Sequence, residues 1–217
     1  MKHISPDGIE RTCRARIGKC RYKQILELSD LKEKDLISEN HIYSDKSYLD
    51  IVAKAPKIRD DISKVVEDNN GRLEGLEFYI KSRESLATKI LIRKTLHKVE
   101  DAWDVVRFTS VVNTENYVEH YNSLKEDLMN KGYKIISIRN GWGVKNVYKG
   151  LNIKLLSPDD NKIELQIHTP ESLEAKERAH KLYEEQRLLR PSDLRFRELD
   201  NQMADIFNSV PDVSLNL

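Results

Sequence analysis

The stretch from Lys162 to Thr169, with the sequence KIELQIHT, constrains the fold of this chain more than any other part. Its apolar and polar residues alternate, which predicts a β-strand with one buried face. The polar face would carry Glu164, Gln166 and His168, about 7 Å apart along the strand. A carboxylate, an amide and an imidazole in register suit a site for a metal ion and a charged substrate, although a solvated strand face has the same pattern.

Length and charge limit the class of protein. The chain has 217 residues, enough for one domain with a small appendage. Its 37 Lys and Arg residues nearly balance its 36 Asp and Glu residues, which gives a net charge of +1. Overall charge therefore does not indicate nucleic-acid binding, and any phosphate ligand must be held by a local cluster of cations.

The N-terminal part predicts neither a membrane anchor nor a disulfide scaffold. No apolar run approaches the roughly 18 residues of a membrane span, and no apolar segment follows Met1 as in a signal peptide. We expect action in the cytoplasm, with delivery by a route without a signal peptide left open. Residues 1–45 are expected to form an irregular arm. Its Cys13, Cys20 and His41 are either a zinc site of unusual spacing or, more simply, two small buried thiols beside an unrelated histidine.

Residues 46–217 alternate between helical and strand patterns. A helix is expected from Lys46, interrupted by Pro56 and resumed as far as Asn69-Asn70-Gly71. Strands are expected over Leu76–Lys81, Asp101–Val112, Tyr133–Ile138, Leu151–Leu155 and Lys162–His168. Further helices are expected to begin at Ser82, at Asn113-Thr114, at Thr169 and after Pro191. The Ser157–Asn161 turn would make the last two strands antiparallel neighbours.

A basic cluster marks the junction of the first expected strand with the helix that follows it. Its members are Lys81, Arg83, Lys89, Arg93 and Lys94. Lys89 and Arg93 are four positions apart and so share a helix face. Free helix N–H groups together with cations suit a polyphosphate, whereas a solvated helix face would carry the same residues without a ligand.

Two charged residues begin the next expected strand. Asp104 and Arg107 are costly there unless each has a partner or a ligand.

A glycine-containing loop, Asn140–Gly150, precedes the strand at 151–155. The antiparallel pairing of the last two strands would carry Tyr148 of this loop to the end of the sheet where Thr169 lies.

Four segments, in this order, resemble the synthetase domain of RelA/SpoT-type (p)ppGpp synthetases, and most of all its small, stand-alone toxic branch. They are Lys81-Ser82-Arg83-x5-Lys89; Asp104-x2-Arg107-Phe108-Thr109; Tyr148-Lys149-Gly150-Leu151-Asn152; and Glu164 to Glu171. The resemblance covers about residues 46–210. It implies the nucleotidyltransferase-like fold of that family, an α+β arrangement with a mixed β-sheet flanked by helices. It also implies transfer of pyrophosphate from ATP to a ribose 3′-hydroxyl.

The resemblance further implies roles for individual residues. The ATP phosphates would be held by Lys81, Arg83, Lys89, Arg93 and Arg107. Asp104 and Glu164 would hold Mg²⁺, and Glu164 would help to deprotonate the attacking hydroxyl. Tyr148 would position the acceptor nucleotide, with further acceptor contacts from Asn152, Gln166, His168 and Lys176. In-line transfer needs cations on the phosphates and metal between carboxylates, which agrees with these roles.

Three departures from the family's long housekeeping enzymes leave the acceptor and one metal ligand open. Asn152 stands where those enzymes have histidine, and His168 where they have arginine. The glycine-containing entry to their strand is replaced by Asp104-Val105-Val106-Arg107, so Asp101 is a rival for the aspartate role.

Several hypotheses therefore stand beside one another. The acceptor is a guanosine or adenosine di- or triphosphate, or else the 3′ end of a tRNA. The alternatives from other classes are a nucleotide-binding module without catalysis and an interaction protein with a basic groove. The toxic branch also implies a neutralising antitoxin or immunity protein. No segment resembles the family's hydrolase domain, so synthesis without degradation is expected.

Overall fold

The computed structural model describes residues 2–4, 10–12, 46–87, 89–90, 99–143, 148–187 and 189–214. Arg93 and Lys94 of the expected basic cluster lie outside these ranges, and so do Cys13, Cys20 and His41. Near the N-terminus, β1 (Lys2–Ile4) and β2 (Glu10–Thr12) form a short antiparallel pair within the arm that was expected to be irregular.

A five-stranded sheet forms the centre of the fold, with the strand order β3-β4-β7-β6-β5. Its strands are β3 (Arg72–Glu74), β4 (Val106–Val111), β5 (Lys134–Asn140), β6 (Leu151–Leu156) and β7 (Lys162–His168). β4 and β7 run parallel, whereas the other neighbouring pairs are antiparallel. The sheet is therefore mixed, and the β6–β7 pair confirms the antiparallel hairpin expected from the sequence.

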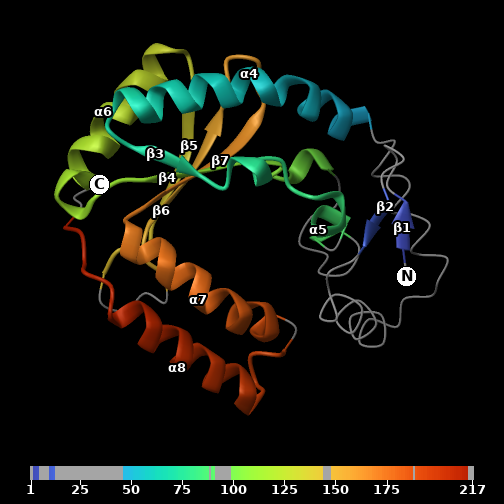
Figure 1. Cartoon of the computed structure of the whole chain (residues 1–217), viewed down its shortest axis with the longest axis vertical. Helices are drawn as coiled ribbons and strands as arrows, with labels where there is room; N and C mark the ends of the chain where they lie inside the picture. The colour runs from blue at the N-terminus through green and yellow to red at the C-terminus, as the bar shows by residue number, and fades with distance from the viewer. Residues whose placement is uncertain are drawn as a thin grey trace.

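Helices lie on both sides of this sheet (Figure 1). They are α4 (Lys46–Asp68), α5 (Arg83–Ala87), α6 (Tyr117–Asn130), α7 (Pro170–Gln186) and α8 (Leu194–Asn208). α4 and α6 cover one face, while α7 and α8 lie on the other. The buried, alternating side chains of β6 and β7 are Leu151, Ile153, Leu155, Ile163, Leu165 and Ile167. Burying each of these residues contributes about 1.5–3 kcal/mol, so the alternation that predicts β7 also supplies its stability.

The prediction that Pro56 interrupts the first helix is wrong, because α4 runs without a break for 23 residues. Pro56 is exposed, whereas Ala55, Ile58 and Ile62 are buried on the opposite side of the helix. A proline removes one hydrogen bond from the turn before it. On the solvent side the carbonyl that loses its partner can bond to water, and packing of the buried stripe keeps the helix continuous.

The segment Leu76–Lys81 is not the expected strand. Leu76–Phe78 forms a 3₁₀ turn after Gly75, whose φ of 65° is left-handed, and Ile80 makes a single antiparallel bridge to Val106. The edge strand is instead β3, just upstream. The left-handed backbone at Gly75 turns the chain before Leu76–Lys81 can pair with a neighbouring strand along its length. Alternation of apolar and polar residues was therefore insufficient to predict a strand here.

Helix starts were predicted with mixed success. Thr169 caps α7 as expected: its Oγ1 accepts from Ser172 N at 3.2 Å, and Ser172 Oγ accepts from Thr169 N at 2.9 Å. Ser82 caps α5, since its Oγ accepts from Ser85 N at 3.2 Å. At the start of α6 the chain differs from prediction, because a 3₁₀ turn over Thr114–Asn116 precedes a helix that begins at Tyr117.

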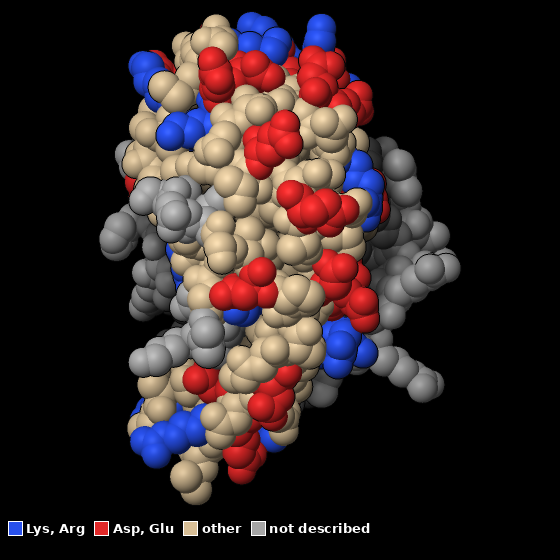
Figure 2. Space-filling model, turned by 90° about the vertical axis from the view of Figure 1, so that its left-hand side faces the viewer, with Lys and Arg blue, Asp and Glu red and all other residues tan. Residues whose placement is uncertain are grey.

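One face of the molecule can be compared with the balanced charge of the sequence. Figure 2 shows one face of the molecule on which acidic and basic side chains are interspersed, without a continuous basic track across its described part. Within the described ranges, no helix is long and apolar enough to cross a membrane. A phosphate ligand must therefore be sought at a local cluster of cations.

Candidate functional site

The face of the sheet opposite α4 and α6 carries a row of polar residues around Glu164. The strand register places Arg107 of β4 beside Glu164 on one side and Lys154 of β6 beside it on the other. Asn152 of β6 lies beside Gln166 in the same way. Glu164 is half-buried, so its carboxylate occupies the middle of a sheet face with a cationic residue on each neighbouring strand.

A chain of hydrogen bonds links Glu164 to helix α7. Gln166 Nε2 donates to Glu164 Oε1 over 2.6 Å, and Lys176 Nζ donates to Gln166 Oε1 over 2.6 Å. Burial lowers the pKa of Lys176 to about 8, against the attraction of Glu164 and with the repulsion of Arg107. Lys176 is therefore charged at neutral pH and loses its proton near pH 8.

Lys81, Lys89 and Asp104 form a second group, which we call the lysine–aspartate cluster. Asp104 Oδ2 accepts from Lys81 Nζ at 2.8 Å and from Lys89 Nζ at 2.5 Å. Lys81 is 5% exposed and Asp104 is 7% exposed. Burial alone would raise the pKa of Asp104, but the two ammonium groups outweigh it and lower that pKa. The shared carboxylate thus holds two cations that would otherwise repel each other.

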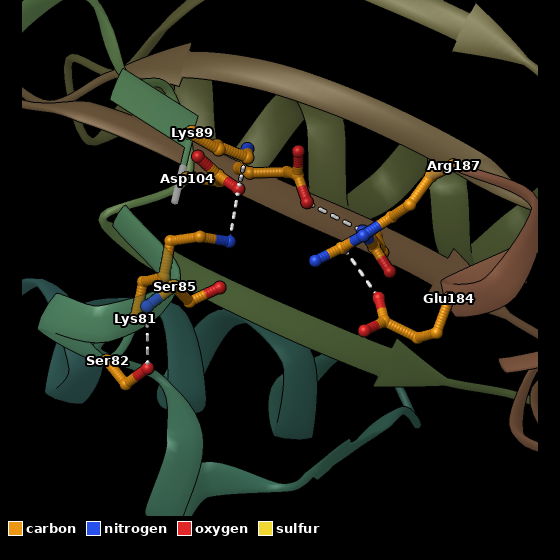
Figure 3. A network of polar contacts seen from close by, with 9 residues as sticks. Lys81, Ser82, Ser85, Lys89, Asp104, Glu184 and Arg187 are labelled. Atoms are coloured by element: carbon orange, nitrogen blue, oxygen red, sulfur yellow. Dashed lines mark hydrogen bonds and ion pairs between the residues drawn. The ribbon is translucent and has the colours of Figure 1, made fainter. Parts of the chain in front are cut away.

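The far end of α7 faces this cluster. Figure 3 shows Arg187 extending from the end of α7 toward Lys81, Lys89 and Asp104. Glu184, on the same helix, accepts from Arg187 Nη1 at 2.5 Å. Sequence analysis missed Arg187. It lies eleven positions after Lys176, close to three helical turns, so the spacing alone could have placed both cations on one face of α7.

Tyr148, His168 and Ser172 form a third group, the tyrosine–histidine cluster. Tyr148 Oη lies 3.0 Å from His168 Nε2, and His168 Nδ1 lies 2.9 Å from Ser172 Oγ. The two rings meet edge to face with centroids 5.4 Å apart. Burial, reinforced by Lys176, lowers the pKa of His168 to about 3, and burial together with Glu164 raises the pKa of Tyr148. Both groups are therefore neutral near pH 7.

Gly150 makes this packing possible. Its φ of 142° belongs to the region that favours glycine, and a Cβ at this position would lie 2.8 Å from His168 Cε1 and 2.9 Å from Ile167 O. Any side chain would push against the imidazole and the strand backbone. The glycine between Lys149 and Leu151 thus lets the loop approach β7 closely enough for Tyr148 to reach His168.

The structure can be compared with the sequence-based predictions residue by residue. It brings Lys81, Lys89 and Asp104 into contact, and it places Arg107, Asn152, Glu164, Gln166 and Lys176 on one sheet face or against it. Arg83, at the start of α5, packs its guanidinium 4.9 Å above the ring of Tyr48. Asp101 ends the 3₁₀ turn Val99–Asp101, three positions before Asp104. Lys154 was missed, although it follows the same alternation as Asn152.

Comparison with solved structures places this arrangement among known folds. The type VI effector Tas1, solved in complex with its immunity protein, matches with a TM-score of 0.55 and 20% identity, over 75% of this chain and 95% of that one. Small alarmone synthetase 1 from Bacillus subtilis, solved with its product pppGpp, matches with a TM-score of 0.52 and 16% identity, over 75% of this chain and 92% of that one. The chain has the fold of the RelA/SpoT-type small alarmone synthetases. At these identities the likeness concerns the fold alone.

Comparison of the sequence itself gives no match. No protein-family model matches the chain, and no curated protein matches its sequence significantly. The alarmone synthetase fold confirms the α+β mixed sheet expected from the four motifs. Because a shared fold does not assign roles to residues, the roles of the row around Glu164, the lysine–aspartate cluster and the tyrosine–histidine cluster must be argued from their own geometry.

Proposed function

We propose that the chain is an ATP-dependent pyrophosphokinase, which transfers the β,γ-pyrophosphate of ATP to the ribose 3′-hydroxyl of a guanosine or adenosine di- or triphosphate. The observation that carries this proposal is the position of Glu164. It lies in the middle of a polar sheet face, between the cations of Arg107 and Lys154 and linked through Gln166 to Lys176. Fixed cations can hold a polyanionic substrate, and the carboxylate between them can take a proton from a hydroxyl group of that substrate.

The lysine–aspartate cluster supports the donor side of the proposal. Asp104 pairs with both Lys81 and Lys89. In the proposed complex the two ammonium groups would bind phosphate oxygens of ATP, and Arg107 and Arg83 would add further contacts. Arg107 is exposed, and its positive charge lowers the pKa of both Lys81 and Lys176. Its charge therefore acts both on the lysine–aspartate cluster and on the polar row around Glu164. Arg93 belongs to the same proposed set by its spacing from Lys89.

The donor set fits Mg²⁺. This ion prefers hard anionic oxygens and is commonly bound by one or two carboxylates together with substrate phosphates. Asp104 and Glu164 are the carboxylates that would hold it. Among the described residues, no three His, Cys, Asp or Glu side chains lie together as a possible metal site. When bound, the ion would neutralise charge on the phosphates.

The residues of the chain then account for the transfer step. The 3′-oxygen of the acceptor forms a bond to the β-phosphorus of ATP, while the bond from that phosphorus to the oxygen shared with the α-phosphate breaks and AMP leaves. Glu164 takes the proton of the hydroxyl. The lysine–aspartate cluster binds the transferred group, and Tyr148 positions the acceptor base, with Asn152, His168 and Lys176 around it.

Two features bear on the acceptor and the partner. His168 is neutral and engaged by Tyr148 and Ser172, so it orients the tyrosine and adds no charge for acceptor phosphates, a task that falls to Lys176. By analogy with Tas1, which was solved with an immunity protein, we include a neutralising protein partner in the proposal. The tRNA 3′ end remains the second acceptor to test.

One assay tests this function. Purified protein is incubated with ATP and Mg²⁺ plus GDP, GTP, ADP, ATP alone or tRNA, and AMP release is measured with the mass of the product. The expected result is AMP release in step with an acceptor whose mass rises by one pyrophosphoryl group. ATP binding without AMP release from any mixture would instead favour a nucleotide-binding module.

A further inference from the structure

The loop between β5 and β6, which carries Tyr148, is fastened at two levels. At its base, Gly141 N donates to Gly150 O over 2.9 Å, which extends the β5–β6 pairing by one bond. Further out, Lys149 Nζ donates to the carbonyl oxygen of Gly143 over 2.7 Å. The second level therefore depends on a side chain rather than on the strand ladder.

A residue from the far end of the chain completes the second level. Asp212 Oδ1 accepts from Gly143 N at 3.1 Å and from Lys149 Nζ at 3.1 Å. The side chain of Lys149 is 4% exposed, whereas that of Asp212 is 46% exposed. A buried ammonium group needs an opposite charge, and Asp212 supplies it from the surface while also binding the loop backbone.

The segment that carries Asp212 is itself held in place. Val210 and Val213, on either side of it, are buried in the main core. Upstream, Phe207 near the end of α8 lies with its ring centroid 6.3 Å from that of Tyr148. The end of α8 and the segment after it thus contact the loop twice, at the ring of Tyr148 through Phe207 and at Gly143 and Lys149 through Asp212.

These contacts give the segment a task within the proposed reaction. We propose that Asp212 is a positioning residue of the acceptor side: together with Lys149 it fixes the loop backbone at Gly143 and so holds Tyr148 where the acceptor nucleotide binds. This inference rests on the proposed function for its kinetic consequence but on geometry alone for its structural one. Asp212 bonds to Gly143 and Lys149 at the Tyr148 end of the sheet, so its effect should be confined to the acceptor.

The test uses four variants of the full chain and a fifth as a control. Asp212→Ala removes both hydrogen bonds, whereas Asp212→Asn keeps an oxygen that can accept them and removes only the charge. Lys149→Met removes the ammonium group, and the double variant Lys149→Met/Asp212→Ala removes both partners. Asp205→Ala, at an exposed position of α8, is the matched control. All are assayed at a temperature at which circular dichroism shows them folded.

Structural and kinetic readouts are measured separately. By NMR, the Gly143 amide is expected to exchange hydrogen at least tenfold faster in Asp212→Ala, with a changed Tyr148 ring signal. Its exchange rate should be intermediate in Asp212→Asn, which keeps the oxygen but not the charge, and within threefold of wild type in Asp205→Ala. With ATP and either GDP or ADP, Asp212→Ala is expected to raise KM for the acceptor about tenfold while KM for ATP stays within twofold. The double variant should be no worse than Asp212→Ala, because both residues act through one contact.

Three outcomes would overturn the inference. One is an unchanged Gly143 exchange rate in Asp212→Ala. Another is an equal rise of both KM values, which would indicate general loss of structure. The third is strict additivity in the double variant. If the wild type transfers no pyrophosphate to any acceptor, the proposed function fails, whereas the exchange and ring measurements still decide whether Asp212 holds the loop.

Discussion

The lysine–aspartate cluster and the tyrosine–histidine cluster lie on either side of Glu164 and differ in the kind of interaction that holds them together. The first is built from charges, with one carboxylate oxygen shared by two ammonium groups. The second is built from neutral groups, since the pKa of His168 is lowered to about 3 and that of Tyr148 is raised. Charges that already have a partner can exchange it for an anionic ligand, whereas neutral hydrogen bonds hold a ring in place at any ordinary pH.

Because of this difference, substitutions in the two clusters should have different effects. Changes in the lysine–aspartate cluster should alter charge balance and therefore both stability and donor binding. Changes in the tyrosine–histidine cluster should alter geometry and acid stability. Glu164 belongs to neither cluster, and its replacement should affect chemistry more than stability.

The largest effect is expected for Glu164→Gln. The amide is nearly isosteric and its oxygen can still accept from Gln166 Nε2, but the charge that faces Arg107 and Lys154 is lost, so the free energy of unfolding should fall by about 1 kcal/mol. It can neither take a proton nor offer Mg²⁺ a full charge, and the loss of such a group typically costs on the order of 3 kcal/mol, or roughly a hundredfold in rate. AMP release measures the rate, and urea unfolding measures the stability.

Glu174→Gln, at an exposed position of α7, is the control and should match wild type in both measurements. A Glu164→Gln protein that folds and releases AMP at the wild-type rate would rule out the mechanism. It would also remove the distinction between Glu164 and the two clusters.

Asp104→Asn should affect stability more strongly than Glu164→Gln does, as well as activity. It leaves the buried ammonium of Lys81 beside that of Lys89 without a full negative charge. Breaking a buried ion pair on one side typically costs about 3 kcal/mol. Urea unfolding at pH 7 measures this loss, and AMP release should fall with it.

Asp101→Asn is the matched control, because Asp101 was the rival for the same role. It should keep activity within a few-fold of wild type. If Asp101→Asn loses activity while Asp104→Asn keeps it, the metal aspartate has been assigned to the wrong residue.

His168→Gln tests the tyrosine–histidine cluster through the pH dependence of the free energy of unfolding. The folded state lowers the pKa of His168 from 6.5 to about 3, so below pH 6.5 the unfolded chain binds a proton that the folded chain does not. Stability is therefore lost as the pH falls from about 6.5 toward 3, by about 2 kcal/mol at pH 5. The variant lacks this loss, so its stability deficit relative to wild type should shrink by that amount between pH 8 and pH 5.

Unfolding by urea at both pH values provides the measurement, and His180→Gln, at an exposed position of α7, serves as the control. An equal deficit at pH 8 and pH 5 would mean that His168 is not held neutral by burial. The tyrosine–histidine cluster would then be less different from the charged cluster than the geometry indicates.

The parts of the fold that the sequence predicted are those governed by local rules. Strand β7 follows from alternation, the β6–β7 hairpin from its turn, and the start of α7 from the Thr169 cap. The errors arose where tertiary packing or a backbone conformation that the pattern does not reveal overrides such rules. The buried stripe of α4 keeps that helix intact through Pro56, and left-handed Gly75 ends the strand pattern at Leu76–Lys81.

The site was predicted to a similar extent. The resemblance of four segments to the RelA/SpoT-type synthetase domain brought Lys81, Lys89, Asp104 and Glu164 into one hypothesis, and the structure places the first three in contact. No local pattern could pair Tyr148 with His168 atom by atom, and none could join Asp212 to Lys149 across 63 positions. Those contacts depend on how the loop, β7 and the segment after α8 pack, which a single sequence does not encode in any short window.

Arg83→Ala should have the smallest effect and would sharpen the description of the donor side. Arg83 lies over the ring of Tyr48 rather than within the lysine–aspartate cluster, so its guanidinium is held by a cation–π contact worth roughly 0.5–1 kcal/mol. Losing the cation should weaken ATP binding by about five- to tenfold, equivalent to roughly 1 kcal/mol, as measured by calorimetry. Tyr48→Leu keeps the cation and removes only its platform, so it should weaken binding less. If Arg83→Ala binds ATP as wild type does, while Lys89→Ala does not, donor recognition is confined to the lysine–aspartate cluster and Arg83 serves only to pack α5 against α4.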